Sequence, residues 1–163
     1  MKKIISIFLL CIFVFGCDYT VPLVKNPELK IDRDIIGLWT RTKENGDAEQ
    51  IAVLPLSERE YLISFTSGGG KSLYARGLPF RLDGMPLVQI EWLGTSAGKP
   101  PQTDRVFQFC TWEIGKSTLE IRLINPKTVD KDIESRKKLK EAVKSAGDNP
   151  ELFREPMRFE KNT

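Results

Sequence analysis

Apolar and polar residues alternate in short stretches over most of the chain between residues 37 and 123. The clearest stretch is 88–92, where two aliphatic residues and a tryptophan alternate with Gln89 and Glu91. A period of two indicates a β-strand with one buried face and one solvated face. We therefore expect a β-rich fold in which this stretch turns Gln89 and Glu91 toward water.

Similar stretches, separated by turn signals, extend this prediction along the chain. Asn45-Gly46 and Asp83-Gly84 are dipeptides that favour tight hairpins, and Pro79 indicates a bend or a sheet edge. Turn signals about every 8–12 residues are typical of barrels and sandwiches. We expect a mainly β fold, an antiparallel up-and-down barrel or half-barrel, with an open β-sandwich as the alternative. The other strands are expected at Gly37–Arg41, Ile51–Leu54, Tyr61–Thr66, Leu73–Arg76, Leu78–Leu82, Val106–Ile114, Leu119–Leu123 and Met157–Phe159.

Residues 130–146 have the period of a helix instead. Their apolar positions form one narrow stripe, which suits a helix that lies against the outside of a sheet. Asp130 or Thr128 is expected to cap the start, and a glycine follows the end. A shorter helix through Ile31–Ile36 is expected after the start signal Asn26-Pro27-Glu28.

The beginning of the chain has a different pattern. Lys2 and Lys3 precede an apolar run that extends from Ile4 to Phe15. This run is shorter than the roughly 20 residues of a membrane-spanning helix, and the layout is that of a secretory signal. We therefore expect residues 1–16 to be removed.

The end of this signal, Val14-Phe15-Gly16-Cys17, resembles the bacterial lipoprotein signal, in which cleavage before the cysteine accompanies its acylation. The resemblance implies that acyl chains such as palmitate on Cys17 hold the protein on the extracytoplasmic or periplasmic side of a membrane of the bacterial cell envelope. Two or more chains give stable attachment. Asp18 is the acidic second residue that marks inner-membrane retention in enteric-type bacteria. We expect residues 17–30 to be a lipidated tether and 31–163 a single β-rich domain.

Composition excludes several classes of function. The chain contains no histidine, which removes Ser-His-Asp and Cys-His catalysis and histidine-based zinc sites. No other acid/base or nucleophile constellation is visible, so we expect a protein that is not an enzyme and has no cofactor or metal. Loss of the signal lowers the basic residues from 25 to 23 against 22 acidic ones, a net charge of +1. Nucleic-acid binding, which needs a strong basic excess, is therefore not expected.

Of the three cysteines, Cys11 would leave with the signal and Cys17 would be acylated. Cys110 would then be alone, and a lone thiol in an oxidising compartment is best kept in a core. No intramolecular disulfide is expected, so apolar packing must hold the fold.

The mature domain carries a second resemblance. Gly37-Leu38-Trp39, at the entry of the first strand, is similar to the Gly-x-Trp signature of lipocalins. In that family the tryptophan closes one end of the barrel and an arginine late in the last barrel strand packs over it. The resemblance implies a lipocalin-like barrel in which Arg122 has the place of that arginine.

Six aromatic residues at strand spacing could line an apolar ligand cavity or fill a core. They are Trp39, Phe65, Trp92, Phe107, Phe109 and Trp112. A barrel of about eight strands either packs solid or leaves room for one small ligand. An enclosed apolar volume of several hundred Å³ would indicate a ligand carrier. A packed interior with an exposed apolar patch would indicate an adaptor.

Two other motifs have simpler interpretations. Gly68-Gly69-Gly70-Lys71-Ser72 lacks the first glycine of a phosphate-binding loop, and a strand is expected after it where that loop needs a helix, so a flexible hairpin is expected. Arg136-Lys137-Lys138 make the helix basic, but acidic neighbours favour a solvated face over a lipid contact.

The sequence thus predicts a membrane-anchored lipoprotein with a binding or accessory module. The leading partner is a small apolar ligand or an envelope protein. The alternative is a protein–protein adaptor with a solid core, which holds its partner on a sheet face or edge.

Overall fold

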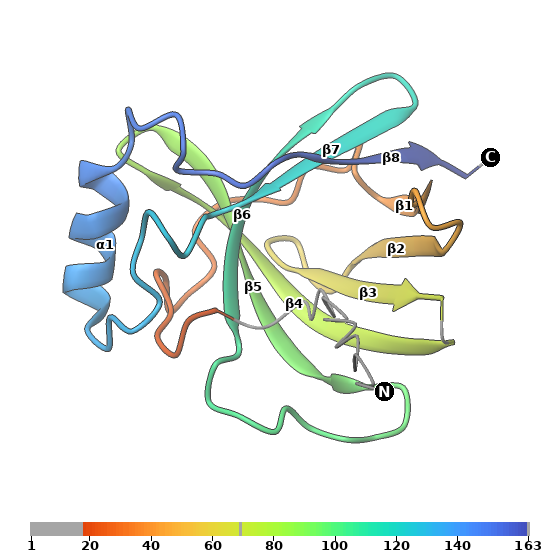
Figure 1. Ribbon diagram of the computed structural model, residues 1–163, viewed down its shortest axis with the longest axis horizontal. Helices are drawn as coiled ribbons and strands as arrows, with labels where there is room; N and C mark the ends of the chain where they lie inside the picture. The colour runs from red at the N-terminus through yellow and green to blue at the C-terminus, as the bar shows by residue number, and fades with distance from the viewer. Residues whose placement is uncertain (1–17, 69, 163) are drawn as a thin grey trace, which may run out of the picture.

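In the computed structural model, which describes residues 18–68 and 70–162, the chain forms a barrel with one helix beside it (Figure 1). The strands are β1 Gly37–Thr42, β2 Ala48–Pro55, β3 Tyr61–Ser67, β4 Lys71–Leu82, β5 Met85–Thr95, β6 Phe107–Ile114, β7 Thr118–Leu123 and β8 Met157–Lys161, and α1 is Arg136–Ser145.

Each strand pairs antiparallel with the next one in sequence. β8 then pairs with β1, with Trp39 opposite Lys161, and this contact closes the barrel. The up-and-down barrel expected from the alternating pattern is confirmed, with one helix near the C-terminal end, and the fold is not an open sandwich. The architecture is consistent with a lipocalin-like barrel.

Two apolar cores hold the described part of the chain together. The first fills the barrel and includes Trp39, Phe65, Trp92 and Cys110. The second lies outside the barrel, between α1 and the outer face of β4, β5 and β6, and we call it the outer core. Its members include Leu23, Leu78, Phe109, Leu139 and Val143.

The hairpin of β4 and β5 is longer than the rest of the barrel. The segments expected at 73–76 and 78–82 are one continuous strand. β3 pairs with β4 only as far as Gly77, and beyond that point β4 pairs with β5 alone. Pro79 therefore lies at a sheet edge, as its missing N–H predicts. The tip of the hairpin reaches α1, where the Lys144 ammonium lies 2.9 Å from the Asp83 carboxylate.

Residues 18–36, which we call the strap, include the described part of the segment 17–30 that was expected to be a tether, and this segment packs against the barrel. Tyr19, Leu23 and Val24 are buried against the outside of the barrel. The Tyr19 hydroxyl donates to the Val129 carbonyl at 2.9 Å. The expected helix at 31–36 is absent, and a turn there is closed by the Ile36 N–H, which donates to the Arg33 carbonyl at 3.1 Å.

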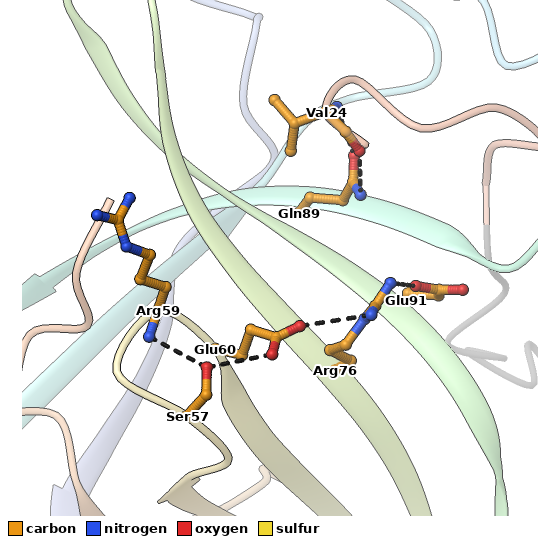
Figure 2. Close-up of polar contacts among 7 residues, drawn as sticks. All are labelled: Val24, Ser57, Arg59, Glu60, Arg76, Gln89 and Glu91. Carbon is orange, nitrogen blue, oxygen red and sulfur yellow. Dashed lines mark hydrogen bonds and ion pairs between the residues drawn. The ribbon is translucent and has the colours of Figure 1, made fainter. Parts of the chain in front are cut away.

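Gln89 explains how the strap crosses β5. Its side chain was expected in water but is 1% exposed. The amide accepts from the Val24 N–H and donates to the Val24 carbonyl, both at 3.0 Å (Figure 2). A buried amide needs such partners, so Gln89 holds the strap through its backbone.

The helix starts later than expected. Residues 126–132 form turns, and the Asp130 carboxylate accepts from the Asp132 N–H at 2.9 Å. Ser135 is the cap of α1, and neither Asp130 nor Thr128 has that role. The predicted apolar stripe is confirmed, because Leu139 and Val143 are buried in the outer core.

Candidate functional site

The barrel interior is almost full. Its cavity has a volume of about 50 Å³ and an apolar lining that includes Phe65, Trp92 and Trp112. Sites for small molecules usually measure about 300–1,000 Å³. The interior therefore has room for about one or two water molecules rather than an acyl chain or a similar ligand.

The other three aromatic residues proposed as cavity lining lie elsewhere. Phe107 and Phe109 are on the outer face of β6, where they pack in the outer core. Because β6 is covered on both faces, a period of two along this strand did not distinguish the inside of the barrel from the outside. Trp39 lies at one end of the barrel, where it also lines an open cleft outside the interior.

Trp39 helps to seal that end. Its side chain is fully buried, and its Nε1–H donates to the Ile35 carbonyl at 2.7 Å. The rings of Tyr61 and Trp112 meet edge to face with centroids 5.3 Å apart. The Tyr61 hydroxyl accepts from the Asp32 N–H at 2.6 Å. These contacts form a floor between the interior and the solvent.

The cation expected over Trp39 comes from a different strand. Lys161 on β8 places its ammonium 5.3 Å from the centre of the Trp39 ring. Arg122 is on the outside of β7, where it bonds to Glu120 at 2.6 Å, so that assignment was wrong. The side-chain hydrogen bonds from Arg122 and Arg158 hold the pKa of Glu120 below its ordinary value.

Charged groups lie at the opposite end. Glu49 shares the inward face of β2 with Ile51, because the two residues are two positions apart. Its carboxylate is buried and lies 2.5 Å from Arg41 and 3.0 Å from Lys43. The Arg41 guanidinium also lies 5.0 Å from the centre of the Phe159 ring. A buried carboxylate is tolerated because both cations compensate it.

Above the floor of Trp39, Tyr61 and Trp112 lies an open cleft of about 720 Å³, which we call the basic cleft. One wall is the extended hairpin of β4 and β5, and the other is the turn that joins β6 to β7. The cleft exists because β5 and β6 separate beyond the pair formed by Val88 and Cys110.

The rim of the basic cleft carries an excess of positive charge. Two carboxylates, Asp32 and Asp34, are outnumbered by five basic side chains. In the described part of the chain none of the five forms an ion pair. These five are Lys30, Arg33, Arg81, Lys116 and Lys161, and all are exposed.

Sequence reasoning did not foresee this cleft. Lys30 was assigned to the tether, and Lys116 lies between two expected strands, Val106–Ile114 and Leu119–Leu123. Their positions in sequence are far apart, and only barrel closure brings them to one end. The single local signal is that charged residues cluster near Gly37-Leu38-Trp39, at the entry of the first strand.

A second polar cluster lies on the outer face of β3, β4 and β5. Arg76 bonds to Glu91 at 2.7 Å and to Glu60 at 3.4 Å, and Glu60 also accepts from Ser57 (Figure 2). The three charged side chains are half-buried, and surface ion pairs each stabilise a fold by up to about 1 kcal/mol. Among residues 18–68 and 70–162, no group of three or more acidic or cysteine side chains is arranged to hold a metal ion.

Cys17 and residues 1–16 lie outside the described residues, so the expected lipidation site is not part of this structure. Asp18 is the first described residue. Its N–H donates to the Phe107 carbonyl at 3.1 Å, and its carboxylate accepts from Arg154 at 2.7 Å. Burial raises the pKa of this carboxyl, and the nearby Arg154 offsets part of that rise. Asp18 therefore has a role within the fold itself.

Within the same described residues, no helix combines the length and apolar character needed to cross a bilayer. Of the glycine motif, Lys71 and Ser72 are the first residues of β4, which pairs antiparallel with β3, so the expected hairpin is found and a strand, not a helix, follows the glycines. Comparison with family models, curated proteins and solved structures finds no match to this chain.

Proposed function

We propose that the protein is a lipid-anchored binding module of the bacterial cell envelope, which holds its partner in the basic cleft outside the barrel. The observation that carries the proposal is the contrast between an interior cavity of about 50 Å³ and a cleft of about 720 Å³. Of the two sequence hypotheses, this contrast favours the adaptor with a solid core over the carrier of a small apolar ligand.

The anchor part of the proposal rests on the sequence. The charged start, the apolar run and Gly16-Cys17 occur in the order of a lipoprotein signal. Replacement of Cys17 by serine should move the protein from the membrane fraction to the soluble fraction and abolish incorporation of a labelled fatty acid. Persistent membrane attachment of the Cys17→Ser variant would refute the anchor.

The binding part is tested in living cells by photo-crosslinking. A photoreactive amino acid at Lys116, on the rim of the basic cleft, should trap one or a few discrete partners. The same group at Lys137, on the exposed face of α1, is the matched control. An identical adduct pattern at both positions, or no adduct at Lys116, would contradict a binding role for the cleft.

A further inference from the structure

This inference rests on the proposed function and concerns the kind of partner that the basic cleft accepts. It starts from the backbone of β6. β6 pairs with β5 from Phe107 to Cys110 only, whereas its pairing with β7 continues to Ile114. The last part of β6 therefore has a strand on one side and the cleft on the other.

The direction of the backbone groups follows from two hydrogen bonds. The Val106 carbonyl accepts from Trp92 on β5, and the Phe109 carbonyl accepts from Ile124 on the β7 side. Because successive residues of a strand point their N–H and C=O groups to opposite sides, even-numbered residues of β6 face β5. The N–H and C=O groups of Trp112 and Ile114 consequently face the cleft as a free strand edge.

The facing edge of β5 is different. The Trp92 N–H donates toward β6, so Pro86, six residues earlier, lies on the same side. Pro86 has no N–H to donate, and proline is a common means of blocking a strand edge. The cleft thus has one edge that can pair with another strand and one that is blunted.

The charges on the rim of the basic cleft give a second, independent indication of the partner's chemistry. The cleft rim carries five exposed cations without ion-pair partners among the described residues, against two carboxylates. An anionic partner would complement this surface. A free strand edge selects for extended polypeptide backbone, and the cations select for acidic side chains.

We propose that the basic cleft binds an extended, acidic polypeptide segment of a partner protein, which adds as a strand to the Trp112–Ile114 edge of β6. Main-chain hydrogen bonds to this edge provide the docking geometry. Glutamate or aspartate side chains at alternating positions contact the basic rim, to which the strap contributes Lys30 and the turn between β6 and β7 contributes Lys116. A small anion would be attracted by the basic rim but could not pair with the edge of β6 as a strand does.

The test uses the detergent-solubilised protein and a capped ten-residue peptide in which glutamate and threonine alternate. Amide hydrogen exchange is followed by NMR. The Trp112 and Ile114 amides should exchange at least about tenfold more slowly with peptide bound, because they gain hydrogen bonds. The Thr111 and Glu113 amides face β7 and should not change.

Three comparisons complete the test. The double variant Lys30→Glu/Lys116→Glu should bind the peptide about tenfold or more weakly, whereas Lys137→Glu/Lys138→Glu on α1 should bind within about twofold of the wild type. A peptide with alternate N-methylated backbone nitrogens should lose binding. Inorganic tripolyphosphate is the probe for a simple anion site.

The proposal is overturned if the acidic peptide does not bind, if it binds without protection of the Trp112 and Ile114 amides, or if the N-methylated peptide binds equally well. It is also overturned if tripolyphosphate binds as tightly as the peptide, which would indicate an anion site. Photo-crosslinking at Lys116 keeps the two proposals apart, because a trapped partner together with failed peptide binding would remove only this inference.

Discussion

At the scale of single residues, the fold depends on polar side chains that are buried and individually compensated. Glu49, Gln89 and Gln108 are each 1–2% exposed. Glu49 has two cations, and Gln89 has the backbone of Val24. Gln108 forms a side-chain hydrogen bond with Asp18. Since a buried polar group without a partner costs about 1–3 kcal/mol, each contact fixes where its neighbouring segment must lie.

Asp18 gives a prediction about pH. Burial raises the pKa of its carboxyl in the folded state, so the folded protein binds a proton more readily than the unfolded chain. Stability contributed by this group is present below the unfolded pKa, about 3.9, and is lost as pH rises through the folded pKa. An asparagine at position 18 has no charged form to bury. The free energy of unfolding of Asp18→Asn should therefore improve relative to the wild type as pH rises from 3 to 7.

Urea unfolding of both detergent-solubilised proteins at several pH values measures this difference. A difference that stays constant with pH would mean that the ion pair with Arg154 fully compensates the burial of Asp18.

At the scale of elements, the strap and α1 cover a face of the sheet that would otherwise be apolar and exposed. Figure 1 shows α1 at one side of the barrel, with the first part of the strap between the helix and the strands. Leu23 from the strap and Leu139 from the helix pack in the same outer core. The two elements therefore stabilise each other.

This packing predicts that Leu23→Ala is strongly destabilising. Leu23 is fully buried, and replacement of a buried leucine by alanine costs about 2–5 kcal/mol. Lys25→Ala, in the same strap but exposed, should change stability by less than about 0.5 kcal/mol. Equal, small effects of the two substitutions in urea unfolding would show that the strap is a loose tether after all.

The elements also show what sequence patterns can and cannot predict. The alternation of apolar and polar residues located the strands, because the backbone of any strand points successive side chains to opposite faces. It assigned Gln89 to water because the strap that covers it comes from residues more than 60 positions away. The helix start was misplaced because Asp130 can cap a turn as well as a helix. The basic cleft was missed because its cations come from four separate segments, the strap, β4, the turn between β6 and β7, and β8, which only the closed barrel brings together.

At the scale of the whole molecule, a closed barrel with a full interior leaves its lone described thiol inaccessible. Cys110 is fully buried, and burial raises the pKa of its thiol to about 12. Alkylation requires the thiolate and access to it. The folded protein should therefore resist iodoacetamide at pH 8 and react only when it is unfolded.

The number of thiols that react after unfolding also reports on the proposed anchor. Loss of Cys11 with the signal and acylation of Cys17 would leave one reactive thiol of the three in the sequence. Intact-mass analysis after alkylation in guanidinium counts them. Two or more alkylated cysteines in membrane-derived protein would be incompatible with a processed, acylated N-terminus.

The attachment of Asp18 to the barrel limits how far the basic cleft can lie from the membrane if Cys17 is the anchor. Its backbone is already bonded to Phe107 at the start of β6, so a single peptide unit, about 3.8 Å between Cα atoms, joins Cys17 to the folded body. If Cys17 carries the lipid, no flexible linker separates the folded domain from the membrane. The basic cleft lies at the other end of β6, roughly 20 Å away at about 3.3 Å per residue. Any partner would then have to bring its acidic segment to within about this distance of the lipid anchor, because the domain could not move far from the membrane to reach it.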